Sequence, residues 1–231
     1  MDDTEIDVLA YEPSPSGMIC LRRRAVPNEP GVFATEITLD HQFLMSSANT
    51  QSERELAARA LELHGGANLR VLVGGLGLGY TAAAALRCDS VGSVEVVELL
   101  APVLDWLERG WFPLAGELRA DARFAARQGD VYAELAAPPA RLHDLILIDV
   151  DHSPAEHLGA SSAGFYTAEG LAAAKRHLAP GGVLGVWSYA ESTRFADALR
   201  AVFSDVRVAS VRFENAVVAG SETNWLFFAR A

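Results

Sequence analysis

A run of apolar residues that ends in closely spaced glycines constrains this chain more than any other segment. Residues Val71–Gly79 read Val-Leu-Val-Gly-Gly-Leu-Gly-Leu-Gly, and an alanine-rich segment follows through Leu86. This pattern predicts a buried strand, a tight turn and the start of a helix. Gly75, Gly77 and Gly79 permit positive φ angles and close approach of a ligand, and the first N–H groups of the helix point toward that ligand. We therefore expect a nucleotide-like cofactor at this turn.

The chain beyond residue 68 alternates between apolar strands and helical segments. The predicted strands are Leu69–Gly74, Ser93–Glu98, Arg123–Gln128, Leu145–Asp149 and Val183–Ser188. The predicted helices are Tyr80–Arg87, Ala101–Phe112, Val131–Ala136, Phe165–Leu178 and Ser192–Phe203. Such alternation predicts a doubly wound α/β fold, in which helices cover both faces of a mainly parallel sheet. Val206–Phe213 and Trp225–Ala229 then form an antiparallel hairpin at the sheet edge, which brings the sheet to seven strands.

The segment before residue 65 has a different character. Short runs that favour β-structure, separated by prolines and glycines, predict small hairpins at Ile6–Tyr11, Met18–Leu21, Val32–Leu39 and Phe43–Met45. A helix is expected over Gln51–His64, where leucine and alanine have helical spacing and Gly65-Gly66 follows. We therefore expect two units, a β-hairpin unit with a linking helix over residues 1–65 and a Rossmann-like catalytic unit over residues 66–231.

The charge balance and the cysteines narrow the function classes. The net charge is −11, so no broad basic face is available for a phosphate backbone and nucleic acid is disfavoured as a partner. The only basic run, Arg22–Arg24, is interpreted as a solvated strand end. Cys20 and Cys88 lie far apart and are expected to be small core residues. No apolar run reaches the ~18 residues of a membrane span, so no membrane association and a cytoplasmic location are expected.

Acidic residues or glycines recur where the predicted strands end. Glu98 closes the second strand 19 residues after Gly79, a position from which a carboxylate accepts hydrogen bonds from ribose hydroxyls. The third strand leads into Gly129-Asp130, and the fourth ends at Asp149. Each acid alone is equally explained as a helix N-cap or a solvated strand end. Their placement at consecutive strand ends favours a shared ligand beyond the carboxyl edge of the sheet.

The spacing of the turn glycines discriminates among cofactors. A dinucleotide fingerprint has G-x-G-x-x-G, whereas here glycine recurs at every second position and Tyr80 occupies the final slot. The order of strand-end signals instead resembles class I S-adenosylmethionine-dependent methyltransferases, and within them the spermidine synthase branch. Further resemblance lies in Leu39-Asp40, in the helix around Glu53-Arg54-Glu55, in Phe165-Tyr166 and in the stretch Leu178–Val183.

The resemblance implies a role for each strand-end residue. Glu98 would bind the ribose hydroxyls, Asp130 the adenine, and Asp149 would face the reacting centre. The expected cofactor-binding set comprises Gly74, Gly75, Gly77, Gly79, Glu98, Leu99, Gly129, Asp130 and Asp149. The cofactor would be S-adenosylmethionine or decarboxylated S-adenosylmethionine, and the relatives suggest a homodimer formed through the N-terminal hairpins.

Three departures from the spermidine synthase pattern affect the functional hypothesis. That family has an Asp inside the glycine turn where this chain has Gly77, and a Tyr-His or Tyr-Gln pair where this chain has Glu53-Arg54. Its Asp-Ser-Ser-Asp-Pro loop corresponds to Asp149–Pro154, which gains a histidine. Ordinary S-adenosylmethionine carries its own carboxylate, which an Asp in the turn would repel. The sequence therefore favours methylation of a small amine or hydroxyl acceptor, with aminopropyl transfer to a polyamine precursor and a non-catalytic binding protein as alternatives.

The remaining site candidates lie in loops and at element ends. Asp149, Asp151 and His152 are candidates for the catalytic base, although a histidine before Ser-Pro is also common as a solvent-facing turn residue. Substrate-pocket candidates are Gln42, Tyr166 and Trp187. His41 and the acids near Asp149 lack a fixed ligand spacing, so no metal site is expected.

Overall fold

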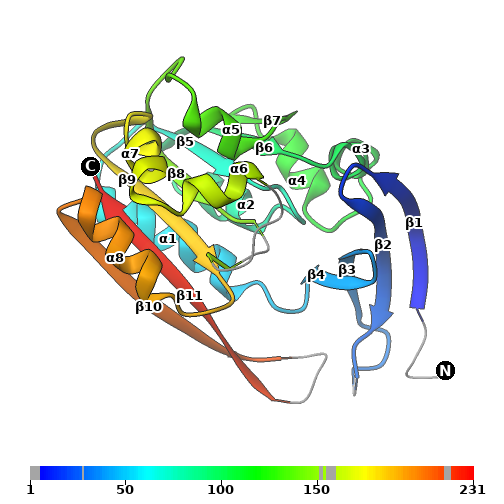
Figure 1. The fold of residues 1–231 in the computed structure, drawn as a ribbon. Helices are drawn as coiled ribbons and strands as arrows, with labels where there is room; N and C mark the ends of the chain where they lie inside the picture. The colour runs from blue at the N-terminus through cyan, green and yellow to red at the C-terminus, as the bar shows by residue number, and fades with distance from the viewer. Residues whose placement is uncertain (1–5, 28, 151–152, 155–159, 216–219) are drawn as a thin grey trace.

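The computed structural model describes residues 6–27, 29–150, 153–154, 160–215 and 220–231. Two sheets make up its framework (Figure 1). A four-stranded antiparallel sheet contains β1 (Ile6–Ser14), β2 (Gly17–Ala25), β3 (Phe33–Leu39) and β4 (Gln42–Ser46), in that order. The predicted short hairpins thus join into one continuous sheet. Its first two strands are longer than expected because each pairs along its whole length with a neighbour.

The larger sheet has seven strands in the order β10-β11-β9-β8-β5-β6-β7. Its parallel strands are β5 (Leu69–Gly74), β6 (Val91–Glu98), β7 (Phe124–Gln128), β8 (His143–Ile148) and β9 (Leu178–Ser188). An antiparallel hairpin, β10 (Asp205–Glu214) and β11 (Ser221–Arg230), completes the edge. The predicted mainly parallel, doubly wound sheet with a C-terminal hairpin is confirmed. Its switch point lies between β5 and β8, where ligands bind in such folds.

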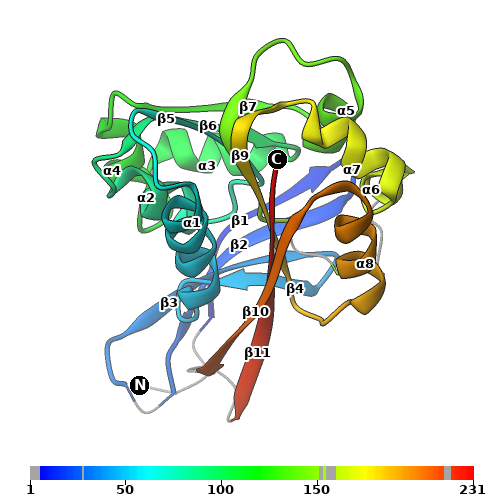
Figure 2. The ribbon, with the colours of Figure 1, turned by 90° about the vertical axis from the view of Figure 1, so that its left-hand side faces the viewer.

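Helices cover both faces of the larger sheet, as the alternating strands predicted (Figure 2). One face packs against α1 (Gln51–His64), α2 (Tyr80–Leu86) and α3 (Ala101–Arg109). The opposite face packs against α5 (Val131–Ala136), α6 (Ala160–Phe165), α7 (Ala168–Lys175) and α8 (Thr193–Val202). Adjacent residues of one strand serve the two cores: Val71 and Val73 face the first, and Leu72 faces the second. This alternation follows from the period of two in a strand.

Two predicted helices have different bounds in the structure. The segment 165–178 is divided, because the Thr167 side chain caps α7 by accepting a hydrogen bond from the Gly170 N–H at 3.1 Å. The helix from Ala101 ends at Arg109, because Gly110 adopts a left-handed conformation with φ of 72°. A short helix, α4 (Ala115–Ala120), follows it and was not predicted.

Helix α1 connects the two sheets and packs on the larger one. Leu56, Ala57 and Ala60 are buried in the core that also holds β5 and β9. In Figures 1 and 2 the first turn of α1 lies between β4 and the larger sheet. The start of this helix is therefore placed close to the carboxyl ends of the parallel strands.

Candidate functional site

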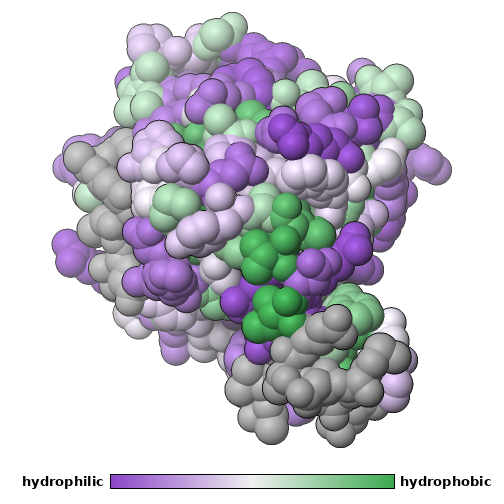
Figure 3. All heavy atoms as spheres, turned by 90° about the vertical axis from the view of Figure 1, so that its right-hand side faces the viewer, coloured by the Kyte–Doolittle hydropathy of each residue, from purple (hydrophilic) through white to green (hydrophobic). Residues whose placement is uncertain are grey.

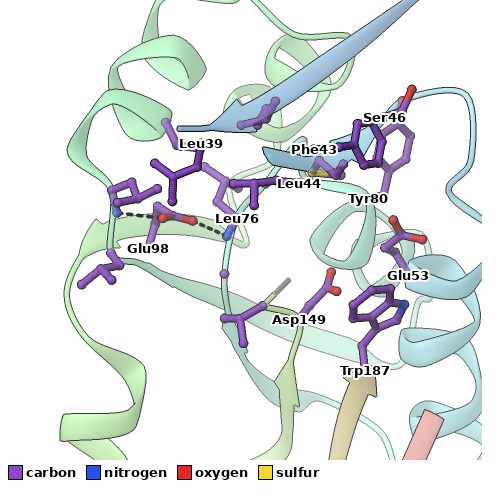
Figure 4. Close-up of a pocket in the computed structure, with 18 of the residues that line it drawn as sticks. Leu39, Phe43, Leu44, Ser46, Glu53, Leu76, Tyr80, Glu98, Asp149 and Trp187 are labelled. Carbon is purple, nitrogen blue, oxygen red and sulfur yellow. Dashed lines mark hydrogen bonds between the residues drawn. The ribbon is translucent and has the colours of Figure 1, made fainter. Parts of the chain in front are cut away.

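A cavity of about 710 Å³ lies at the carboxyl ends of β5, β6 and β8. It is bordered by the glycine turn after β5, by β4 of the smaller sheet, by the first turn of α1 and by the β10–β11 hairpin. The volume is within the range of small-molecule sites, roughly 300–1,000 Å³. Most of the described residues that the sequence selected line this cavity. Figure 4 shows Glu98, Asp149 and Trp187 among them.

The glycine turn adopts the positive φ angles that the sequence predicted. The φ angles are 91° at Gly75, 50° at Gly77 and 85° at Gly79. Gly75 and Gly77 line the cavity, whereas Gly74 and Gly79 are not among its described lining residues. An added Cβ would meet Val131 at Gly74 and Leu118 at Gly79, so these two glycines serve helix packing. An added Cβ at Gly75 would overlap the carbonyl oxygen of Asp149, so this glycine keeps β5 and β8 close together.

Glu98 is held in the cavity wall by backbone donors from both sides. The N–H of Leu76 donates to Oε2 at 2.7 Å, and the N–H of Leu100 donates to Oε1 at 2.8 Å. Burial raises the pKa of Glu98, and these backbone hydrogen bonds oppose the rise. A carboxylate has about four acceptor positions. Glu98 can therefore keep both backbone hydrogen bonds and still accept one from each hydroxyl of a diol. The neighbouring Leu99 also lines the cavity.

Gly129 and Asp130 reach the cavity from the end of β7. Asp130 is the N-cap of α5, and its Oδ1 accepts from the N–H groups of Tyr132 at 2.9 Å and Ala133 at 3.2 Å. The helix-cap interpretation of this acid is therefore correct, and it does not exclude a ligand contact because Asp130 also lines the cavity. The cap fixes the carboxylate at the cavity rim.

Asp149 stands at the end of β8 and lines the cavity floor. Burial raises its pKa to about 6, and the hydrogen bond from the Thr81 hydroxyl to Oδ2 acts in the opposite direction. A group with this pKa exchanges a proton near neutral pH, which suits a base. Asp151 and His152, the two other candidates for the base, lie outside the described residues.

Sequence reasoning missed a second carboxylate beside Asp149. Glu53, in the first turn of α1, lines the same cavity, and its side chain points toward the space that Asp149 faces (Figure 4). Burial and the charge of Asp149 raise the pKa of Glu53 to about 7. Glu55, two residues along the same helix, accepts a hydrogen bond from Arg59 one turn further on.

Two of the three predicted pocket residues line the cavity, and the third does not. Trp187 at the end of β9 lines the cavity, and its indole N–H donates to the Ser52 hydroxyl oxygen at 3.0 Å. Gln42 lines it from the start of β4. Tyr166 is buried instead: its hydroxyl lies 3.0 Å from that of Tyr132, and it is not among the described lining residues. Tyr132 lines the cavity, so Tyr166 supports the wall from behind.

The basic run on β2 is more than a solvated strand end. Arg22 and Arg24 both form ion pairs with Glu36, whose side chain is fully buried, at N···O distances of 2.8 and 2.6 Å. Only Arg23 points to solvent. The original interpretation failed because Glu36 is 12 to 14 residues away and becomes a neighbour only through the pairing of β2 with β3.

Two classes of feature are absent from the part of the chain that the structure describes. There is no cluster of three or more metal-ligating side chains. There is also no helix of the length and apolar character that crossing a membrane requires.

The fold can be compared with solved structures. A spermidine synthase from Thermotoga maritima superposes with a TM-score of 0.75 and 19% identity, over 98% of this chain and 74% of that one. The chain has the fold of the spermidine synthases. A spermidine synthase in complex with the transition state analogue AdoDATO gives a TM-score of 0.74 at 19% identity, over 98% of this chain and 73% of the other. A probable spermidine synthase from Corynebacterium glutamicum ATCC 13032 gives 0.67 at 19% identity, over 96% and 79% of the chains.

The likeness to the spermidine synthases lies in the fold and in short motifs rather than in overall sequence. No protein-family model matches the chain, and no curated protein matches it. The resemblance that the ordered strand-end motifs suggested is confirmed at the level of the fold, and it includes the N-terminal antiparallel sheet.

Proposed function

We propose that this chain transfers an alkyl group from a sulfonium nucleoside donor to an amine, with aminopropyl transfer as the first candidate reaction. The observation that supports it most is the convergence of Glu98, Asp130 and Asp149, from the ends of β6, β7 and β8, on one cavity of a spermidine synthase fold. In this proposal Glu98 binds the ribose hydroxyls, Asp130 the adenine amino group, and the backbone at Gly75 and Gly77 borders the rest of the donor.

The charges on the cavity floor support a cationic donor tail and a cationic acceptor. Glu53 and Asp149 are both carboxylates at the base of the cavity, and each attracts an ammonium group. A structural neighbour was solved with the transition state analogue AdoDATO, which supports decarboxylated S-adenosylmethionine as the donor here. A diamine such as putrescine is then the first acceptor to test.

Methyl transfer from ordinary S-adenosylmethionine is the second candidate, and the turn residue Gly77 favours it. The spermidine synthases have an acid at the corresponding position, but here the Met45 side chain takes up the space beside Gly77. A donor that carries its own carboxylate meets less repulsion at such a turn. The acceptor in this case is a small amine or hydroxyl compound.

The residues that line the cavity perform little covalent chemistry in either reaction. The sulfonium donor supplies an activated carbon when it is bound. The task of the chain is to align the nucleophile with that carbon and to exclude water, which the apolar wall of Leu39, Leu44 and Leu76 supports. A base is needed when the acceptor enters as an ammonium ion.

Calorimetric titration with both donors tests the proposal. We expect decarboxylated S-adenosylmethionine to bind more tightly than S-adenosylmethionine, and putrescine to be converted when both substrates are present. Tighter binding of S-adenosylmethionine favours methylation. If neither donor binds, the remaining hypothesis is a non-catalytic protein. In Glu98→Gln we expect the affinity for the preferred donor to fall by about 10- to 100-fold, roughly 1.4–2.8 kcal/mol. Glu117→Gln, in an exposed ion pair with Arg87, is the matched control.

A further inference from the structure

Two carboxylates from different elements, a buried glutamate and a half-buried aspartate, border the same part of the cavity. Glu53 belongs to the first turn of α1, and Asp149 follows β8. Figure 4 shows their carboxyl groups directed toward a common space below Tyr80 and beside Trp187. Like charges so placed do not ionise independently.

The groups that contact the carboxylates of Glu53 and Asp149 are neutral hydrogen-bond donors, not cations that would neutralise their charges. Ser52 donates to Glu53 Oε2 at 2.8 Å, and the Thr81 hydroxyl donates to Asp149 Oδ2. The charge of Arg54 lowers the pKa of Glu53, but less than burial and Asp149 raise it, and its guanidinium carbon lies 5.3 Å from the centre of the Tyr80 ring. Among the ion pairs between described residues, none includes Glu53 or Asp149.

A hydrogen-bond network fixes the position of Glu53. The Ser52 oxygen accepts from the Trp187 indole N–H at 3.0 Å and from the Asn224 amide at 2.9 Å. With both donors directed at this oxygen, the Ser52 hydroxyl hydrogen is left to donate to Glu53. Strands β9 and β11 thus orient an acid that α1 supplies. Such a network holds a functional carboxylate in place more firmly than its own rotamer preferences do.

We propose that Glu53 and Asp149 act together as the proton acceptor for the attacking amine. The inference rests on the proposed function. The acceptor arrives as an ammonium ion and transfers one proton to the doubly ionised pair, which then holds that proton between its two carboxylates. The neutral amine attacks the carbon attached to the donor sulfur. The carbon–sulfur bond breaks, its electron pair stays on sulfur as a neutral thioether, and the new carbon–nitrogen bond leaves an alkylammonium product. The pair returns its proton to water after product release.

The proton affinities of the two groups suit this step. Burial raises the pKa of Asp149 to about 6, and burial together with the Asp149 charge raises that of Glu53 to about 7. The doubly ionised state therefore becomes available just above neutral pH, where it is a stronger base than an ordinary carboxylate.

An NMR titration of side-chain carboxyl carbons tests the pair without any substrate. In the protein labelled at glutamate Cδ, we expect the Glu53 signal, assigned by its loss in Glu53→Gln, to titrate near pH 7. In Asp149→Asn we expect its midpoint to fall by about one pH unit or more, because the neighbouring negative charge is gone. A Glu53 midpoint below pH 5 in the unmodified protein, or one that Asp149→Asn leaves unchanged, overturns the proposal.

Turnover measurements then connect the pair to the reaction. We expect kcat/KM of the unmodified protein to rise with pH through about 7. In Glu53→Gln we expect kcat/KM to be at least 10-fold lower, and the rising limb of its pH profile to move down to about pH 6. Glu55→Gln, two residues along α1 and bonded to Arg59, should keep both the rate and the limb. A lower rate with an unmoved limb assigns Glu53 a purely structural role. Donor binding is measured separately by calorimetry. If a donor binds but the pH profile fails these expectations, the role of Glu53 is wrong. If no donor binds, the proposed function itself is wrong.

Discussion

The thioether sulfur of Met45 lies 3.1 Å from the backbone nitrogen of Leu78 and accepts its hydrogen bond. The same sulfur occupies the volume beside Gly77, where an ideal Cβ would overlap it. Strand β4 of the smaller sheet is thereby attached to the glycine turn of the larger one. The absence of an acid at residue 77 and the presence of methionine at residue 45 are therefore two parts of one packing arrangement.

Gly77→Asp should destabilise the fold through this contact. The φ angle of 50° at residue 77 adds backbone strain to the overlap with Met45, and we expect a loss of about 1–3 kcal/mol of unfolding free energy in urea titrations. Met45→Ala should relieve part of this loss, so the double variant should be more stable than the sum of the two single effects by about 0.5 kcal/mol or more. Gly116→Asp, where a Cβ meets no neighbour, is the control. Additive effects contradict the packing relationship.

The double variant Met45→Ala/Gly77→Asp also tests donor choice. It opens space beside the turn and places a carboxylate there, which attracts an ammonium group and repels a carboxylate. We expect the ratio of the affinities for decarboxylated and ordinary S-adenosylmethionine to rise by about 10-fold, roughly 1.4 kcal/mol, in calorimetric titrations. An unchanged ratio places the donor tail away from residue 77.

The sequence predicts those parts of the site that depend on local order along a strand. Glu98 and Asp149 directly follow runs of apolar residues, Asp130 comes two residues after the end of β7, and parallel strands bring their carboxyl ends to one edge. Glu53 was not predicted because its direction depends on how α1 docks on the larger sheet. From the sequence, Glu53 and Glu55 are equivalent acids two residues apart on one helix.

Tyr166 was predicted to line the substrate pocket, but it does not. Its place at the start of a predicted helix after the fourth strand indicated a pocket wall, but the polar cap at Thr167 starts a new helix there. The Tyr166 ring instead packs against Phe165 and Phe195 with centroid distances of 5.1 Å. Side-chain direction near a helix break is set by such tertiary contacts, which spacing along the sequence does not encode.

The effect of Arg22 and Arg24 on unfolding free energy should depend strongly on the charge of Glu36. Replacement of both arginines in Arg22→Gln/Arg24→Gln leaves a fully buried carboxylate without its two cations, and we expect a loss of about 3–5 kcal/mol in urea unfolding. Addition of Glu36→Gln should recover most of that loss, because the uncompensated charge disappears. Arg23→Gln, on the exposed side of the same strand, should change stability by less than about 0.5 kcal/mol. No recovery in the triple variant means that packing of the arginine stems, rather than charge, carries the effect.

We expect a homodimer that forms through the smaller sheet. Ile6, Val8 and Tyr11 of the edge strand β1 are about half exposed, at 48%, 56% and 52%. Figure 3 faces this side of the molecule and shows apolar residues grouped among polar ones in its lower half. Light scattering should give twice the monomer mass, and Val8→Asp should lower it to that of the monomer. Leu142→Asp, at a separate exposed apolar residue, is the control. A monomer at all concentrations contradicts the prediction.

Stability should fall as the pH rises through neutrality, and Glu53 should cause much of the fall. Its pKa is about 7 in the folded chain against 4.5 for an ordinary glutamate, so its stabilising contribution is complete below about pH 4.5 and is lost as the pH rises through about 7. A shift of this size corresponds to about 3 kcal/mol. We expect urea unfolding of Glu53→Gln to show a smaller decrease in stability between pH 5 and pH 8 than the unmodified chain, with the remainder due to Asp149. Glu55→Gln should retain the full decrease. An equal decrease in all three proteins means that Glu53 ionises in the folded chain as it does in the unfolded one.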